Sequence, residues 1–212
     1  MTKAEQLAQL KKRMEGDSSL PLRLGATQLV FGEGNPDTKI YFLGEGPGYH
    51  EDKLGRPFVG MAGKLLDETL SEIGLKREDV YISNIVRFRP PENRDPEPEE
   101  IAAFQPYVDA EIKIIDPEII VTLGRFSMGK FLPNVKISVV HGKPFFIEFL
   151  GKEILVIPMY HPAAALRRGE ILKDFKEDFK IIIKALNSEI ENPNKPVEEE
   201  KKPEKPQLEL FE

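Results

Sequence analysis

Short apolar segments rich in β-branched residues alternate with helical segments along this chain, and this alternation constrains the fold more than any other feature. The predicted strands lie at 39–43, 79–86, 119–123 and 154–158. The predicted helices carry apolar residues at helical spacing and lie at 2–15, 62–73, 97–115, 125–132 and 174–186. Parallel strands need such helical crossovers between them. We therefore predict an α/β fold, with a parallel sheet and helices on both of its faces.

The remaining segments predict less regular structure. We expect a short strand at Leu29–Phe31 and one or two edge strands within 136–149. The polar stretch 49–58 is expected to be a surface loop with a function. Residues 87–98 are too rich in proline and charge for regular structure.

Length and charge divide the chain into a domain and a tail. Its 212 residues suffice for one α/β domain, which we place at 1–186. A linker rich in Pro, Glu and Lys is predicted at 187–206, followed by a separate peptide at 207–212. The chain has a net charge of −6, but the segment after 186 holds eight acidic and four basic residues, which leaves −2 for the domain. A nearly neutral domain can still present a local basic face to phosphates.

Two absences limit the classes of function. No cysteine occurs, which excludes disulfides, thiolate metal sites and cysteine nucleophiles. No apolar run reaches the roughly 18 residues of a membrane helix. The N-terminal residues lack the apolar stretch of a secretory signal. We therefore expect a cytoplasmic protein.

Three short motifs each follow an apolar run, at 39–43, 80–82 and 154–159. They are the loop Gly44–Gly48, which contains Glu45, the residue Asn84, and His161, which precedes a proline. In parallel α/β sheets, ligands bind outside the carboxyl ends of the strands. An acid, an amide and an imidazole are therefore expected to line one pocket. Such a set suits recognition of a planar polar ring and stabilisation of charge on it as a bond breaks.

Each motif also has a purely structural explanation. A glycine-rich loop can be a plain turn, Asn84 can cap its loop, and His161 can be a buried structural histidine. Phe58, in a polar loop, can anchor that loop in the core or serve as a stacking platform for a base. Five arginines surround these loops and would ordinarily be solvated surface; they are Arg87, Arg89, Arg94, Arg167 and Arg168. Two of them, Arg167 and Arg168, follow His161 in a proline-anchored loop, where they could hold phosphates. No histidine spacing supports a metal site.

Taken together, several motifs in order resemble the uracil-DNA glycosylase superfamily, most closely its family-4 type, from about Leu22 to Leu186. The matching segments are Val30–Pro36, Gly44–Gly48, Gly55–Gly60, Asn84–Val86, Arg89–Arg94 and His161–Ala163. The resemblance implies a three-layer α/β/α sandwich with a four-stranded parallel central sheet. It also implies hydrolysis of the N-glycosidic bond of a flipped-out deoxyuridine in base excision repair.

The resemblance assigns roles by position. Glu45, Gly46 and Pro47 would line the uracil pocket, and Phe58 would stack on the flipped base. Asn84 would read the uracil edge, His161 would donate a hydrogen bond to O2 of the departing base, and Glu51 would position or activate water.

Uracil-containing DNA would be the partner, contacted by Arg94, Arg167 and Arg168. Ala165 and Leu166 would be the intercalating side chains of a minor-groove wedge. We expect a monomer associated with the nucleoid.

One departure from the family is large. Family-4 members usually hold a 4Fe–4S cluster on four cysteines, but the matching positions here are Asp17, Leu20, Phe88 and Phe104. None of these can supply the thiolate that such a cluster needs. We expect no cofactor and no metal, and hypothesise that the apolar residues fill the volume of the cluster.

The tail carries a separate signal. Gln207, Leu208, Leu210 and Phe211 belong to a pentapeptide, QLELF, that resembles the peptide by which proteins dock on replication sliding clamps. A tethered anchor of this kind raises the local concentration of an enzyme at its site of action.

Two further readings stay open at this point. The domain could be a catalytically inactive relative that binds uracil or damaged DNA and recruits repair partners, although retention of the site residues favours an enzyme. It could instead be an α/β protein that binds a mononucleotide through its glycine-rich loop. The acid in that loop and the absence of a phosphate-binding lysine argue against the second reading.

Overall fold

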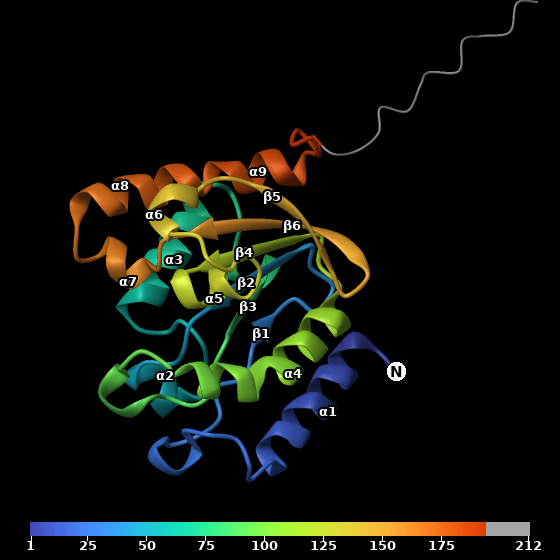
Figure 1. The fold of residues 1–212 in the computed structure, drawn as a ribbon, viewed down its shortest axis with the longest axis vertical. Coiled ribbons are helices and arrows are strands. Elements are labelled where there is room, and N and C mark those ends of the chain that lie inside the picture. Colours follow the sequence, from blue (N-terminus) through green and yellow to red (C-terminus); the bar gives the residue numbers. More distant parts are fainter. Residues whose placement is uncertain (194–212) are drawn as a thin grey trace, which may run out of the picture.

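The computed structural model describes residues 1–193 and shows a mixed α/β fold around one six-stranded sheet (Figure 1). The strand order is β1-β3-β2-β4-β6-β5. The strands are β1 (Glu33–Gly34), β2 (Ile40–Gly44), β3 (Tyr81–Asn84), β4 (Ile119–Leu123), β5 (Phe145–Phe149) and β6 (Lys152–Met159). The predicted C-terminal peptide 207–212 lies outside the described residues.

The predicted four-stranded parallel sheet is the central part of this larger mixed sheet. Strands β3, β2, β4 and β6 run parallel to one another, while β1 and β5 add to the two edges in antiparallel orientation. The four parallel strands therefore belong to a six-stranded mixed sheet rather than forming a sheet of their own. β2 and β4 are buried along their whole length, as expected for central strands covered on both faces.

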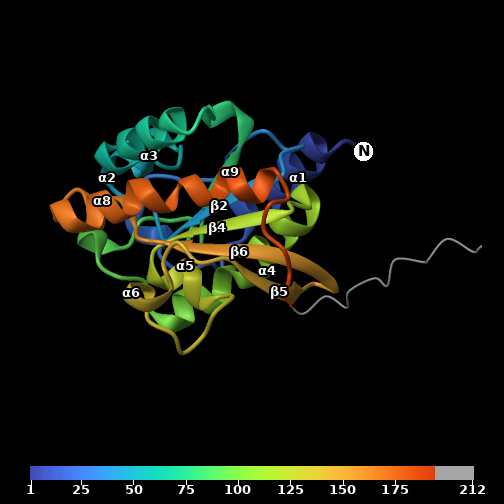
Figure 2. The same cartoon turned by 90° about the horizontal axis from the view of Figure 1, so that it is seen from above.

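Helices cover both faces of the sheet (Figure 1). Successive side chains of a strand point to opposite faces, so each strand contributes to two cores. Tyr41 and Leu43 point into a core closed by α1 (Lys3–Gly16) and α4 (Pro98–Ile115). Ile40 and Phe42 point into a second core, closed by α3 (Met61–Glu72), α8 (Gly169–Asp178) and α9 (Lys180–Leu186). Figure 2 shows α8 and α9 running end to end along the sheet, where a single helix at 174–186 was predicted.

The predictions that were wrong concern short elements near the edges of the sheet. The stretch 49–58 contains a helix, α2 (Tyr49–Leu54), rather than only a loop. The short strand predicted at Leu29–Phe31 lies instead at Glu33–Gly34. Part of the predicted edge-strand region forms the short helix α6 (Ile137–Val140) before β5 begins.

The other short elements connect these layers. They are the α-helices α5 (Arg125–Gly129) and α7 (Pro162–Ala165), and three 3-10 turns, η1 (Arg23–Gly25), η2 (Arg77–Asp79) and η3 (Pro91–Asn93). Within residues 1–193, none of the helices has the length and apolar character needed to span a bilayer.

A buried ion pair joins α4 to the segment that follows β3. Arg87 and Glu111 are fully buried, with Nη2 of the arginine 2.6 Å from Oε2 of the glutamate. Glu111 also accepts hydrogen bonds from Tyr41 and Tyr81. Burial raises the pKa of Tyr81 far above its usual value, the Glu111 carboxylate and the neighbouring Tyr41 raise it further, and Arg87 opposes the shift. Arg87 is thus a core residue and not part of a solvated surface cluster.

Candidate active site

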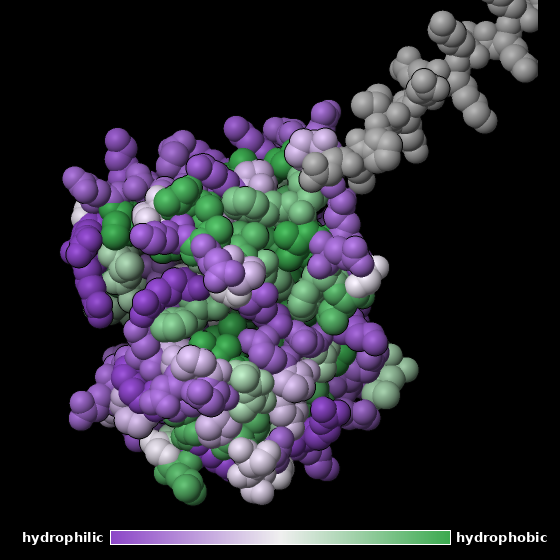
Figure 3. Space-filling view, viewed as in Figure 1, coloured by the Kyte–Doolittle hydropathy of each residue, from purple (hydrophilic) through white to green (hydrophobic). Residues whose placement is uncertain are grey.

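A cavity of about 540 Å³ opens at the carboxyl ends of the parallel strands. In Figure 3 the surface is hollowed at its left edge, between α7 above and α2 below. Most of the predicted site residues line this cavity: Glu45, Gly46, Pro47, Glu51, Phe58, Asn84, Arg94, His161 and Arg167. Glu45 after β2 and His161 after β6 are 116 positions apart in sequence but line the same cavity. This agrees with the rule that ligands bind at the carboxyl ends of parallel strands, which we call the strand-end rule.

Glu45 connects the glycine-rich loop to the start of α5. Its Oε1 accepts a hydrogen bond of 2.9 Å from the backbone N–H of Phe126. Gly124 must be glycine here, because its φ is +111° and an added Cβ would collide with that carboxylate. Burial raises the pKa of Glu45 to about 7, and the Phe126 N–H partly opposes this shift. The carboxyl therefore holds its proton to a higher pH than an ordinary glutamate does.

Asn84 presents its side-chain carboxamide to the cavity. It is the last residue of β3, its side chain is 1 % exposed, and it lines the cavity. Its Oδ1 is buried and accepts no hydrogen bond from the described residues. An unsatisfied buried acceptor costs about 1–3 kcal/mol. A ligand that offers an N–H at this point would recover that cost.

His161 is the N-cap of α7, and this position fixes its tautomer. Its Nδ1 accepts a hydrogen bond of 3.1 Å from the backbone N–H of Ala163. Nδ1 therefore carries no proton, and the neutral ring carries its proton on Nε2. Burial lowers the pKa of His161 to about 4, an effect that Arg167 reinforces and Glu51 opposes. At neutral pH the ring is an uncharged donor that lines the cavity.

Phe58 forms an aromatic wall beside this donor. Its ring is 5 % exposed and stacks on the His161 ring, with 5.7 Å between centroids and 30° between planes. Gly44, at the end of β2, allows this arrangement. A Cβ at position 44 would meet the Phe58 ring and would lie 2.5 Å from Asn84 Oδ1.

Glu51 is held by the backbone rather than by side chains. One of its oxygens accepts N–H bonds from Val59 at 2.9 Å and Gly60 at 2.8 Å, and the other accepts one from Gly48 at 3.1 Å. Glu51 thereby joins the glycine-rich loop to the segment that carries Phe58. A carboxylate has about four acceptor sites, so one remains for a further donor.

Sequence reasoning missed several residues around the cavity. Arg125 and Asp95 both line it and form an ion pair with each other. Arg125 begins α5 directly after β4, so the strand-end rule applied to β4 could have found it. Tyr160 also lines the cavity, and it directly precedes His161.

The predicted DNA-contacting residues lie in different environments. Arg167 lines the cavity, and Arg168 and Leu166 are exposed next to it, with Leu166 44 % exposed. Arg94 also lines the cavity, but its guanidinium pairs with Glu100. Ala165 is 1 % exposed and packs in the core, which corrects its prediction as an intercalating side chain.

The four positions that match cluster ligands in the resembling family do not fit an iron–sulfur cluster. Leu20, Phe88 and Phe104 are buried in one apolar core cluster, and the two phenylalanine rings lie 6.2 Å apart. Asp17 accepts hydrogen bonds from the Tyr107 hydroxyl at 2.6 Å and from Ser19. No thiolate is present among these donors, and the side chains occupy the space between α1, α4 and the segment after β3.

Comparison with known proteins places these features in a family. The family model described as "Uracil DNA glycosylase superfamily" matches residues 31–187 of this chain. The type-4 uracil-DNA glycosylase of Sulfurisphaera tokodaii is 51% identical over 162 residues, which cover 74% of this chain and 74% of that protein. The type-4 uracil-DNA glycosylase of Thermotoga maritima is 49% identical over 168 residues, which cover 78% of this chain and 86% of that protein. A DNA polymerase of Bacillus phage SP01 is 37% identical over 156 residues, but these are only 16% of its length.

Proposed function

Because this chain belongs to the uracil DNA glycosylase superfamily, we propose that its cavity receives a flipped-out deoxyuridine and hydrolyses the N-glycosidic bond. The observation that carries the proposal is the pairing, in one cavity, of an unsatisfied amide oxygen on Asn84 with an uncharged donor on His161. The first suits recognition of a base edge, and the second suits stabilisation of that base as it leaves.

Asn84 is proposed to read the edge of uracil. Its free Oδ1 would accept the N3–H of uracil, and its amide N–H would donate to O4. Cytosine presents the reverse pattern at these two positions, with an acceptor at N3 and an amine at C4. Cytosine would therefore leave the buried Oδ1 unsatisfied, which disfavours it by about 1–3 kcal/mol.

His161 is proposed to stabilise the departing base. Cleavage of the glycosidic bond places negative charge on the uracil ring, including O2. The Nε2–H of the neutral ring is held in place because Nδ1 is bound to the Ala163 N–H. A preorganised donor of this kind typically contributes about 2.7–4 kcal/mol to lowering the barrier.

Glu51 and Phe58 are proposed to complete the reaction centre. Phe58 would stack on the flipped base from the wall that it forms with His161. The Glu51 carboxylate would offset positive charge on the sugar and orient a water molecule through its remaining acceptor site.

DNA is proposed to lie across the mouth of the cavity beside α7. Arg167 and Arg168 would contact phosphates, and the exposed Leu166 would enter the space left by the flipped base. Arg94 would contribute to the same surface once its pair with Glu100 is exchanged for a phosphate.

Uracil release compared with cytosine release tests this function. Oligonucleotides that contain one uracil or one additional cytosine at the same position are incubated with the protein, and the free base is quantified by chromatography. We expect release of uracil and not of cytosine, and a loss of uracil release in Asn84→Ala. Release that is unchanged in Asn84→Ala would contradict the assigned role, whereas binding without release would indicate an inactive damage-binding protein.

We also propose that the peptide Gln207–Phe211 binds a replication sliding clamp, with Leu208, Leu210 and Phe211 as its apolar contacts. Deletion of residues 207–212 should abolish co-elution with a clamp and leave uracil release from short oligonucleotides unchanged. Continued co-elution of the truncated chain would refute this assignment.

A further inference from the structure

The loop that carries Phe58 has an unfavourable backbone conformation. Phe58 has a φ of +51°, in the left-handed region that a bulky residue seldom adopts. Such a residue costs about 1–3 kcal/mol and persists only where its surroundings enforce it. Gly63 is part of those surroundings, because a Cβ at this position would collide with the carbonyl of Phe58. The loop therefore needs specific contacts that hold it in this conformation.

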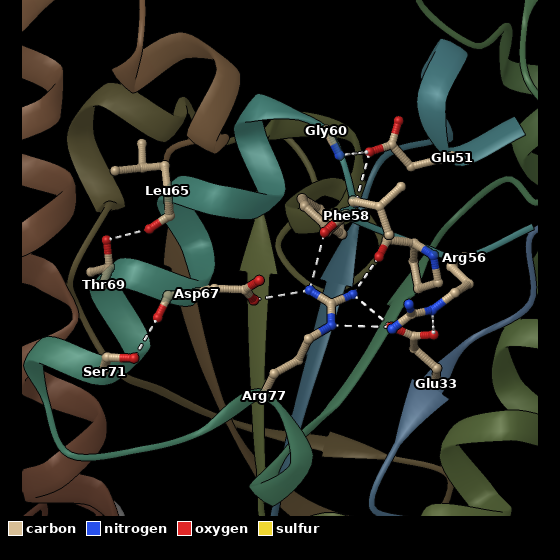
Figure 4. A network of polar contacts seen from close by, with 12 residues as sticks. Glu33, Glu51, Arg56, Phe58, Gly60, Leu65, Asp67, Thr69, Ser71 and Arg77 are labelled. Carbon is tan, nitrogen blue, oxygen red and sulfur yellow. Dashed lines mark hydrogen bonds and ion pairs between the residues drawn. The ribbon is translucent and has the colours of Figure 1, made fainter. Parts of the chain in front are cut away.

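Arg77 supplies such contacts on one side of the loop. Its guanidinium donates to two consecutive carbonyls, those of Pro57 and Phe58, the latter at 3.1 Å. It is itself fixed by Glu33 at 2.8 Å and by Asp67 at 3.0 Å (Figure 4). Arg77 lies in η2 and does not line the cavity, and its side chain is only 18 % exposed.

Glu51 supplies the complementary contacts on the other side. Its carboxylate accepts from two consecutive amides, those of Val59 and Gly60, which follow Phe58 directly. Figure 4 shows Glu51 and Arg77 on opposite sides of this segment. The Arg77 guanidinium thus binds two carbonyls, and the Glu51 carboxylate binds the two amides that come next along the chain. The strained residue Phe58 lies where these two sets of contacts meet.

We propose that Arg77 is a positioning residue for the base-binding cavity: with Glu51 it clamps the segment 57–60, so that the Phe58 ring is held against His161. This inference rests on the proposed function, in which Phe58 stacks on the flipped base. Arg77 touches neither the base nor the reacting atoms. Without its guanidinium, Phe58 would relax from the left-handed region and its ring would leave the wall of the cavity.

The chain offers a matched control in Arg56. This residue also pairs with Glu33, at 2.8 Å and 3.1 Å, but it is 59 % exposed and its described contacts do not include the carbonyls of the loop. Arg56→Met therefore removes one arginine from the same glutamate without opening the clamp. Arg77→Met removes the clamp, and Arg77→Lys keeps the charge but loses the planar fork that reaches several acceptors at once.

The experiment measures kcat and KM for uracil release, the dissociation constant of free uracil, and thermal unfolding, for the full chain and each variant. For Arg77→Met we expect at least a tenfold rise in KM and a tenfold weaker affinity for free uracil at a temperature where the protein is folded. Arg77→Lys should fall between this variant and the wild type. Arg56→Met should stay within twofold of the wild type in both quantities.

A double variant tests whether Arg77 acts through the phenylalanine ring. In a Phe58→Leu background, Arg77→Met should weaken uracil binding by less than twofold further, because the ring that it positions is already absent. A variant Arg77→Met that unfolds at a lower temperature but binds uracil as the wild type does would overturn the proposal and leave Arg77 a purely structural residue. If Arg77→Met does not fold, Arg77→Lys decides by the same criteria. A wild type that releases no uracil would instead refute the proposed function, and the affinity for free uracil would still test the clamp.

Discussion

At the scale of single residues, burial shifts two titratable groups of the cavity toward their uncharged forms. It raises the pKa of Glu45 to about 7 and lowers that of His161 to about 4. Glu51, in contrast, has its charge compensated by three backbone amides. The cavity thus combines an uncharged donor near the base with a fixed carboxylate, which is the distribution required when charge separates between a base and a sugar.

Glu45→Gln should change the pH dependence of stability. Below about pH 4.5 the carboxyl is protonated in both the folded and unfolded states. As the pH rises toward 7 the unfolded state ionises while the folded state retains its proton, so the wild type loses stability relative to the variant. Above pH 7 the variant should be more stable by about 2 kcal/mol, a value reduced from the full pKa shift because the side chain is partly exposed.

Urea unfolding of both proteins at pH 4.5, 6 and 8 measures this difference. The titration of His161 affects both proteins alike, so it cancels in the comparison. A difference in unfolding free energy that is independent of pH would show that the Glu45 carboxyl titrates in the ordinary range.

At the scale of elements, the ends of β2 and β3 meet under Phe58, and Gly44 leaves room for this meeting. In Gly44→Ala the added methyl group would press on the Phe58 ring and on Asn84. We expect a loss of about 1–3 kcal/mol in stability from overpacking, together with slower uracil release. Gly129→Ala is the matched control, because nothing lies within 4 Å of a Cβ at that position in α5. Equal activity of both variants would contradict the proposed crowding.

The elements also show what can and cannot be predicted from this sequence. The strand Ile119–Leu123 has the same bounds in the structure as in the prediction, because a continuous apolar run between turn signals has few alternatives. The helix α2 was missed because its polar residues give no periodicity. Its ends are set by tertiary and local contacts instead, with Glu51 bound to the Gly48 N–H and Gly55 in the left-handed region.

The candidate site was easier to predict than the contacts that support it. Asn84 and His161 were recognised because they follow apolar strands, and both line the cavity. Arg77 was missed because nothing local distinguishes an arginine in a charged segment from a solvated one. Its partners are Glu33 and Asp67, 44 and 10 positions away, and only the fold brings them together.

At the scale of the whole molecule, an apolar cluster joins the N-terminal helix to the rest of the domain. Leu20, Phe88 and Phe104 come from three separate segments and share one core with α1 and α4. Phe104→Ala should lower the free energy of unfolding by about 3–5 kcal/mol, because it leaves a large cavity in this core. Thermal and denaturant unfolding would measure it, and a change below about 1 kcal/mol would show that the cluster contributes little.

The Phe104→Ala protein should retain its activity where it is folded. Phe104 does not line the active-site cavity, and the hydrogen bond that fixes His161 comes from the Ala163 N–H, not from Phe104. Equal kcat for the variant and the wild type at a temperature well below both unfolding transitions is therefore expected. A large fall in kcat under those conditions would show that this core determines the geometry of the site.

The central claim is that this cavity releases uracil with His161 as the neutral donor. The most direct test is cleavage of a labelled duplex with a single U·G pair, followed by alkaline breakage at the abasic site, with His161→Ala beside the wild type. We predict uracil release by the wild type and a rate reduced roughly 10²–10³-fold in His161→Ala. A wild type that binds this DNA but leaves it intact at every temperature tested, or a His161→Ala variant as fast as the wild type, would contradict the claim.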